Sequence, residues 1–362
     1  MPFLDIILSS SLYTNHFILY TNPMALKVAI NGFGRIGRCF ARAAEGDSEI
    51  EIVAINDLGN LENLAYLLKY DSVYRTAKFE VSGQDGILTI GKNKAKFLQE
   101  KDPANLPWKD LNVDIVVEST GLFTDFAKAK VHLDAGAKRV VISAPAKSSD
   151  VGVSGVTVLM GVNEGKLSES ALSSNASCTT NAASPLIAIL DAALGIEKAV
   201  LSTVHGYTAS QSLVDGPSKK DVKEGRGAAQ NIVPTSTGAA IAVTQAYTQL
   251  EGKFDGISLR VPVPAGSIAD VTFIAKRNTT VEEVNKILSD AASAPGWQGI
   301  FSVTNEPLVS SDIIGSEFGS IADLGLTRVI DGNLVKVMAW YDNEMGYTHT
   351  LVRHVKEAGK HI

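Results

Sequence analysis

The chain has two cysteines, and one of them, Cys178, stands where a nucleophile would be useful. It follows Ser177 in the stretch "SNASCTTN" and comes just before the apolar run "LIAILDAAL". The apolar run predicts a helix that begins at this cysteine. A helix N-terminus stabilises a thiolate, so the pKa of the thiol is expected to be lowered. The alternative is a small buried core residue, the usual fate of a free cysteine. Cys39, inside an apolar helical stretch, is expected to be of that second kind.

A nucleophilic thiol needs a base, and His205 has the most suitable position among the six histidines. It ends the strand-like run "AVLSTVH" and precedes Gly206, so its side chain is expected at the edge of an element. Such a position allows a histidine to exchange a proton with a neighbouring nucleophile. A structural histidine held by hydrogen bonds is the alternative.

Residues beyond His205 are suited to binding an anion. The loop "DGPSKKDVKEGRGA" carries Arg226 and three lysines, and "TSTGAA" offers Thr237 and backbone N–H groups at Gly238. Arg260 is the single charge in the apolar strand "ISLRVPVP". A planar guanidinium in such a strand suits a buried phosphate, whereas a basic loop is usually a solvated surface.

The first half of the chain has the spacing of a dinucleotide-binding turn. A strand ends at Asn31, Gly32-x-Gly34-x-x-Gly37 follows, and Asp57 closes a second strand 20 residues after Gly37. Gly32 would permit the turn, Gly34 the approach of pyrophosphate, and Gly37 the packing of helix on strand. The helix N-terminus would bind the phosphates, and Asp57 would accept a ribose hydroxyl and repel a 2′-phosphate, which favours NAD. A glycine triplet alone could also be an ordinary tight turn.

The remaining elements predict two kinds of sheet. The apolar strands "VDIVVESTG" and "RVVISAP" end in Ser119-Thr120 and Ser143, which would line the cofactor crevice of a doubly wound parallel sheet. After Cys178 the strands are longer and more alternating, which is typical of a mostly antiparallel sheet in an α+β domain. We therefore expect a Rossmann-type NAD-binding domain at 24–177, a catalytic domain at 178–341, and a last segment at 342–362.

Composition limits the class of protein. The 362 residues carry a net charge of −6 and no basic stripe, so nucleic acid is not expected as a partner. No apolar run is long enough to span a bilayer, so no membrane is expected either. Two cysteines suit a reducing compartment, and we expect a cytoplasmic protein without a metal site. Residues 1–23 lack Lys and Arg, unlike a leader peptide, and are interpreted as an extension that is disordered or not native.

From about Lys27 onward the chain resembles the phosphorylating, NAD-dependent glyceraldehyde-3-phosphate dehydrogenases. The resemblance rests on ordered motifs: "NGFGRIGR", "LKYDS", "DPANLPW", "ESTGLF", "AGAKRVVISAP", "SNASCTTN", "VDGPSKKD", "STGAA" and "WYDNEMGY". It implies that Cys178 is the nucleophile and His205 the general base. It also implies a homotetramer, in which the loop containing Pro217 reaches a neighbouring subunit's cofactor, and a final helix that packs back on the nucleotide domain.

The resemblance also assigns binding residues. Cofactor contacts are expected at Gly34, Arg35, Ile36, Asp57, Thr120 and Asn343. The attacking phosphate is expected at Ser177, Thr179, Thr237 and Gly238, and the phosphate of the substrate at Thr208 and Arg260. The chain departs from the family pattern at Ala182, where a second cysteine is frequent, and at Lys101, where an arginine is common and an adenosine contact is expected. Lys223, Glu224 and Ser210 are further departures.

The expected reaction converts glyceraldehyde 3-phosphate to 1,3-bisphosphoglycerate with NAD and inorganic phosphate. It would pass through a thiohemiacetal and a thioester on Cys178. Two alternatives stay open: an erythrose-4-phosphate or semialdehyde dehydrogenase with the same chemistry, and a non-catalytic binding protein. Intact Cys178, His205 and Arg260 argue against the last.

Overall fold

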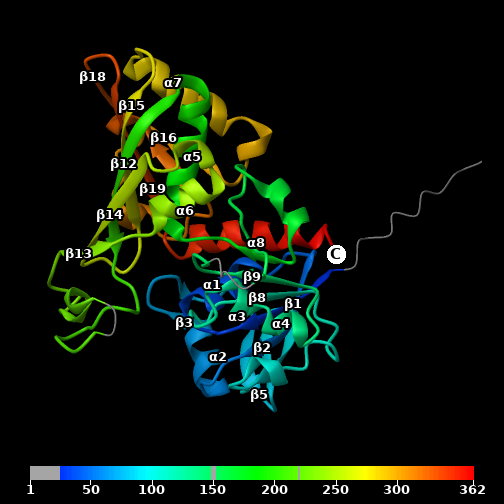
Figure 1. Cartoon of the computed structure of the whole chain (residues 1–362). Helices are drawn as coiled ribbons and strands as arrows, with labels where there is room; N and C mark the ends of the chain where they lie inside the picture. The colour runs from blue at the N-terminus through cyan, green and yellow to red at the C-terminus, as the bar shows by residue number, and fades with distance from the viewer. Residues whose placement is uncertain (1–24, 148–151, 219–220) are drawn as a thin grey trace, which may run out of the picture.

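The computed structural model describes residues 25–147, 152–218 and 221–362. Two lobes, each built on one large sheet, are joined through the last helix of the chain (Figure 1). The extension at 1–23 and the lysines at 219 and 220 lie outside the described residues. None of the helices in the described ranges combines the length and apolar character that crossing a bilayer requires.

The first lobe contains a nine-stranded sheet of order β10-β11-β9-β8-β1-β2-β7-β6-β5. All neighbours are parallel except β5, β6 and β7, which form an antiparallel meander. The strands are β1 (Leu26–Asn31), β2 (Ile50–Asn56), β5 (Val81–Gln84), β6 (Ile87–Ile90), β7 (Asn93–Leu98), β8 (Ile115–Glu118), β9 (Arg139–Ile142), β10 (Val156–Thr157) and β11 (Leu172–Ser174). Strands β8 and β9 are buried throughout, as parallel strands covered on both faces are.

The helices of this lobe are α1 (Arg35–Ala43), α2 (Leu61–Lys69), α3 (Phe126–Ala129) and α4 (Val131–Asp134), and a small hairpin joins β3 (Tyr70–Asp71) to β4 (Arg75–Thr76). The doubly wound fold predicted from the sequence is confirmed, with Asp57 directly after β2 and Ser119 directly after β8. Both residues therefore lie at the carboxyl ends of parallel strands, where this fold binds its ligands.

The second lobe contains an eight-stranded sheet of order β13-β14-β12-β15-β19-β17-β16, with β18 also pairing with β19. It is antiparallel except for the β12–β14 and β16–β17 pairs, as the alternating sequence predicted. The strands are β12 (Ile196–Gly206), β13 (Val233–Ser236), β14 (Phe254–Val261), β15 (Ser267–Ala275), β16 (Phe301–Thr304), β17 (Ser320–Asp323), β18 (Arg328–Ile330) and β19 (Leu334–Tyr341).

Helices α5 (Cys178–Leu194), α6 (Ala239–Ala246) and α7 (Val281–Ala292) pack on this sheet. Their apolar residues and the inward residues of β12, β15 and β19 form one core cluster. At the start of α7, half of a capping box forms. Thr280 accepts a hydrogen bond from the backbone N–H of Glu283, but the Glu283 carboxylate accepts from Thr279 and Arg277 instead.

The last helix, α8 (Met345–Gly359), returns from the second lobe to the first. It packs against α1 and contacts β8, β9 and the start of the second lobe at α5 (Figure 1). Because α8 contacts both lobes, residues from the end of the chain come close to the segment that carries Cys178.

Candidate functional site

Cys178 is the first residue of α5, as the apolar run predicted. The hydroxyl of Ser177 accepts a hydrogen bond from the backbone N–H of Thr180 at 3.1 Å and so caps the helix. The helix runs for 17 residues through Pro185, and most of it is buried in the second lobe. The thiol is half-buried, whereas Cys39 is a core residue with 1% of its surface exposed, and both cysteines are free.

His205 lies directly beside the cysteine. Its Nε2 is 3.3 Å from Sγ of Cys178, and its Nδ1 is 2.6 Å from the carbonyl oxygen of Gly206. Because a carbonyl can only accept, Nδ1 carries the proton and Nε2 is the acceptor that faces the thiol. This tautomer is the one that a general base for Cys178 needs.

Arg260 occupies the position on β14 that is paired in register with His205 on β12. Its Nε and Nη1 atoms are buried and have no hydrogen-bond partner among the described residues. A buried guanidinium with unpaired N–H groups is costly unless an anion completes it. The donor geometry suits a phosphate.

Burial raises the pKa of the Cys178 thiol above its ordinary value, while the Arg260 guanidinium and hydrogen bonds from Thr179 act in the opposite direction. Burial and, to a smaller extent, the positive charge of Arg260 lower the pKa of His205 to about 3. The sequence predicted a lowered thiol pKa, but the loss of water around the sulfur outweighs the helix N-terminus. A neutral thiol thus faces a neutral imidazole that can accept its proton.

A chain of hydroxyl groups lies behind the pair, and the sequence did not indicate it. Tyr341 is buried, and its Oη is 2.9 Å from the hydroxyl of Thr179 and 2.7 Å from that of Thr203. The Thr203 hydroxyl donates to the carbonyl oxygen of Ile268 at 3.2 Å. The Tyr341 ring also packs edge-on against His205, so β19 helps to fix the imidazole.

The turn before Cys178 is held in an unusual conformation. Ala176 is fully buried and has a φ of 52°, in the left-handed region that residues with a Cβ rarely adopt. Its carbonyl oxygen accepts a hydrogen bond from Tyr347 Oη at 3.1 Å. The Asn181 side chain donates to the carbonyl oxygens on either side of Ala176, at 2.8 and 3.0 Å. Helix α8 thereby contributes to placing the first turn of α5.

A separate hollow of about 290 Å³ lies at the carboxyl ends of β1, β2 and β8. Predicted cofactor residues that line it are Gly32, Gly34, Asp57, Lys101, Ser119 and Thr120. A Cβ on Gly32 would lie 2.6 Å from the backbone N of Thr120, and one on Gly37 would lie 2.2 Å from the carbonyl oxygen of Gly32. Both positions therefore require glycine, as a dinucleotide-binding turn does, and no Cβ projects from Gly34 toward the phosphates.

The carboxylate of Asp57 accepts hydrogen bonds from the backbone N–H groups of Phe33 at 2.6 Å and Gly59 at 2.8 Å. It thereby fixes the glycine turn relative to β2. An acidic group at this point suits the ribose hydroxyls of NAD and opposes a 2′-phosphate. The residues present therefore fit an NAD molecule.

Four further predicted cofactor residues do not line this hollow: Arg35, Ile36, Ser143 and Asn343. Arg35 pairs with Asp71 and Glu344, which joins the glycine turn to the segment before α8. The side-chain oxygen of Asn343 accepts from Ser267 at 2.8 Å, and the Ser267 hydroxyl accepts from the backbone N–H of Gly206. Ile36 is half-buried in α1, and Ser143 follows β9.

The predicted phosphate residues other than Ser177, Thr179 and Arg260 occupy two segments. Thr237 and Gly238 precede α6, and the Thr237 hydroxyl accepts from the backbone N–H of Ala239. The Thr208 hydroxyl is 3.0 Å from that of Ser210, on the loop that follows β12. Arg226 lies on the same exposed loop and pairs with Asp215, and its role in binding phosphate stays a prediction.

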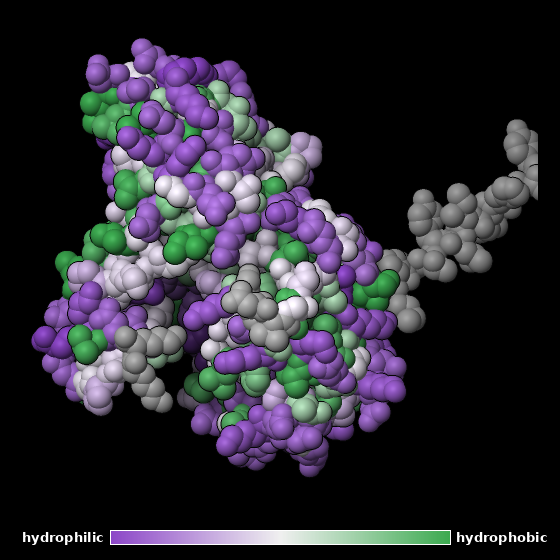
Figure 2. Space-filling model, in the orientation of Figure 1, coloured by the Kyte–Doolittle hydropathy of each residue, from purple (hydrophilic) through white to green (hydrophobic). Residues whose placement is uncertain are grey.

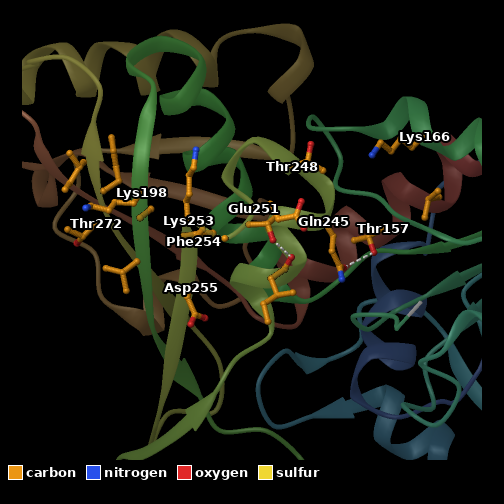
Figure 3. Close-up of a pocket in the computed structure, with 18 of the residues that line it drawn as sticks. Thr157, Lys166, Lys198, Gln245, Thr248, Glu251, Lys253, Phe254, Asp255 and Thr272 are labelled. Carbon is orange, nitrogen blue, oxygen red and sulfur yellow. Dashed lines mark hydrogen bonds between the residues drawn. The ribbon is translucent and has the colours of Figure 1, made fainter. Parts of the chain in front are cut away.

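A larger hollow of about 1160 Å³ lies elsewhere, where α6 and the ends of β12 and β14 face β10 of the first lobe. Figure 3 shows its mixed lining, which includes Lys198, Lys253, Glu251, Asp255 and Thr248. None of the predicted site residues is among the described residues that line it. Volume alone therefore does not identify the reactive site.

Comparison with known proteins agrees with this geometry. Residues 26–126 match the family model of the glyceraldehyde 3-phosphate dehydrogenase NAD binding domain, and residues 177–343 match that of its C-terminal domain. Glyceraldehyde-3-phosphate dehydrogenase 2 of Streptomyces arenae is 48% identical over 332 residues, which cover 91% of this chain and 97% of the relative. Glyceraldehyde-3-phosphate dehydrogenase of Mycobacterium avium is 49% identical over 348 residues, covering 94% and 100%. The chain therefore belongs to the glyceraldehyde-3-phosphate dehydrogenase family of NAD-dependent oxidoreductases.

Proposed function

We propose that Cys178 is the nucleophile and His205 the general base in the NAD-dependent oxidative phosphorylation of D-glyceraldehyde 3-phosphate. The product is 1,3-bisphosphoglycerate. The observation that carries this assignment is the 3.3 Å contact between Sγ and the unprotonated Nε2 of His205. Family membership supports the substrate, the phosphate and the cofactor.

In the first stage, Sγ attacks the aldehyde carbon while Nε2 takes the thiol proton and returns it to the carbonyl oxygen, giving a thiohemiacetal. The backbone N–H of Cys178, at the start of α5, and the protonated imidazole stabilise the developing oxyanion. Bound NAD would supply the acceptor for the hydride that leaves this carbon. His205 takes the hydroxyl proton at the same time, and a thioester on Cys178 remains.

In the second stage, inorganic phosphate attacks the thioester carbon, the C–S bond breaks, and the acyl phosphate leaves. Arg260 would hold phosphate groups at the site, together with the hydroxyls of Ser177, Thr179, Thr208 and Thr237 and the N–H at Gly238. The buried, unpaired Nε and Nη1 of Arg260 support this role. A thioester retains the free energy of the oxidation, so the site must admit phosphate and exclude water.

The test is NADH formation from glyceraldehyde 3-phosphate with and without inorganic phosphate, or with arsenate in its place. We expect steady turnover only when phosphate or arsenate is present. Erythrose 4-phosphate and a semialdehyde, assayed alongside, should give lower kcat/KM. Higher kcat/KM for either of these aldehydes would assign the chain to that substrate instead.

Cys178→Ser tests the nucleophile. We expect turnover to fall by roughly 10³-fold or more, because a serine at this position is a far weaker nucleophile. NAD binding, measured by titration, should be unchanged, and Cys39→Ser serves as the matched control. Strong residual dehydrogenase activity in the Cys178 variant would contradict the scheme.

We further propose the domain division 24–177 and 178–341, with 342–362 returning to the first domain, a cytoplasmic homotetramer, and 1–23 as a dispensable extension. The two separate sheets and the contacts of α8 with α1 support the division. Two free cysteines suit the reducing cytoplasm. Support for the tetramer comes from exposed apolar side chains on the second lobe: Val200, Leu213, Val214, Val222 and Ile257.

A further inference from the structure

Three neighbouring parallel strands of the first lobe end in polar residues that are buried. Asn31, Asn56 and Glu118 are the last residues of β1, β2 and β8, and they are paired in register across the sheet. Their exposed fractions are 2%, 6% and 2%. The residues that follow these strands are predicted cofactor contacts: Gly32, Asp57, Ser119 and Thr120.

Glu118 is the centre of this group, because its carboxylate accepts four hydrogen bonds. Oε1 accepts from the backbone N–H of Thr120 at 2.8 Å and from the Thr120 hydroxyl at 2.5 Å. Oε2 accepts from the side-chain nitrogen of Asn31 at 2.6 Å and from Nε2 of His132 at 3.1 Å. The buried charge is thereby fully hydrogen-bonded.

The protons in this group can be assigned from one fully buried contact. The indole N–H of Trp108 lies 3.1 Å from Nδ1 of His132, and an indole nitrogen can only donate. Nδ1 of His132 must therefore accept, so its Nε2 carries the proton and donates to Glu118. Because Asn31 and the Thr120 backbone also donate, the side chain at position 118 has to accept on both oxygens.

The same group extends to the third strand. The side-chain nitrogen of Asn56 donates to the side-chain oxygen of Asn31 at 2.8 Å and to the backbone carbonyl oxygen of Glu100 at 2.9 Å. The Asn56 side-chain oxygen accepts from the backbone N–H of Glu100, also at 2.9 Å. One continuous set of hydrogen bonds thus crosses the floor of the cofactor hollow.

We propose that Glu118 is a positioning residue for cofactor binding, which holds Thr120 and the ends of β1 and β8 in the spacing that the dinucleotide requires. It does not touch the cofactor and acts through Thr120 and Asn31. The inference goes beyond the chemistry proposed for Cys178. It rests on the hydrogen bonds of the first lobe and on the NAD-binding character of the family.

Glu118→Gln is the sharpest test, since it keeps the size of the side chain and replaces one acceptor by a donor. If the amide nitrogen faces Asn31 and His132, it meets two donors that cannot reverse. If it faces Thr120, the hydroxyl can turn and accept, but the backbone N–H cannot. The second orientation is the less unfavourable of the two. It displaces Thr120, so the change affects the cofactor hollow.

We expect Glu118→Gln to raise the Kd and KM for NAD by about tenfold or more, because a buried donor loses its partner. The KM for glyceraldehyde 3-phosphate and the rate of Cys178 alkylation without NAD should stay within about twofold of the parent. Glu51→Gln, which changes an exposed carboxylate on β2, is the control and should behave as the parent.

A second variant decides the matter if Glu118→Gln does not fold. His132→Phe removes one of the four donors at a distance from the hollow, and we expect a smaller rise in the Kd for NAD, of about threefold. Unchanged NAD affinity in either folded variant would overturn the proposal. It would equally be overturned if the alkylation rate fell in proportion to NAD affinity, because that pattern indicates general damage. Loss of the dehydrogenase chemistry in the parent would refute the proposed function while leaving the NAD titration intact.

Discussion

At the level of single residues, Arg260 and His205 have complementary roles because they are side by side on paired strands. The positive charge of Arg260 lowers the pKa of both Cys178 and His205. It therefore favours the thiolate and, at the same time, the unprotonated imidazole. A single buried guanidinium can thus serve both in binding an anion and in adjusting the reactive pair.

Arg260→Met tests this double role through the pH dependence of Cys178 alkylation by iodoacetamide without NAD. Removing the cation raises the pKa of the thiol, so less thiolate is present at a given pH and the rate profile should shift to higher pH. The KM for glyceraldehyde 3-phosphate should rise by roughly tenfold to a hundredfold, as expected for a lost charge-assisted hydrogen bond. Arg277→Met, at an exposed pair with Glu283, is the control. An unshifted profile would show that Arg260 does not act on the sulfur.

The sequence predicted those residues whose signal is local. Cys178 precedes an apolar run, and Asp57 closes a strand at a fixed distance from the glycines, so a short window of sequence is sufficient for each. Glu118, His132 and Tyr347 gave no such signal, because, apart from Thr120 beside Glu118, the hydrogen-bond partners of their side chains are 14 to 171 residues away in the chain. Arg35 was assigned to the cofactor, and its pairing with Glu344, 309 residues later, could not be predicted from spacing.

At the level of elements, the position of α5 depends on the turn before it and on α8. The apolar run after Cys178 predicted α5, since a helix of this kind is determined by nearby residues. The left-handed turn at Ala176 was not predicted, because glycine or asparagine is the usual signal for that conformation and alanine gives none. What holds the turn is Asn181 in α5 and Tyr347 in α8.

Tyr347→Phe and Ala176→Gly test this dependence together. Loss of the Tyr347 hydroxyl should allow the strained turn to relax and slow Cys178 alkylation by roughly threefold to tenfold, the effect of one buried hydrogen bond. Glycine adopts a positive φ without strain, so adding Ala176→Gly should restore most of the rate. Tyr247→Phe, which removes a hydroxyl bonded to Asp191, is the matched control. If the double variant is alkylated no faster than Tyr347→Phe, the conformation of the turn does not control the reactivity of the sulfur.

At the level of the whole molecule, the second lobe is covered unequally on its two faces. Helices α5, α6 and α7 pack on one face, where Leu201 of β12 is buried. Strand residues alternate between faces, so Val200 points to the opposite side, where it is 51% exposed, and Ile257 on the adjacent strand is 53% exposed. Figure 2 shows hydrophobic residues at the surface beside β13 and β14 and along the loop that follows β12.

We expect this open face to be a subunit interface, because proteins rarely leave a row of apolar side chains in water. In sedimentation velocity the parent should have a mass near four times the 38.3 kDa of one chain. The double variant Val200→Asp/Ile257→Asp should have a lower mass, since two carboxylates at each copy of a symmetric interface repel and are costly to bury. It should also bind NAD more weakly, if the loop containing Pro217 completes a neighbour's cofactor site. Ile362→Asp, at the exposed last residue, is the control. A tetrameric double variant would move the interface to another surface, and a monomeric parent would refute the assembly itself.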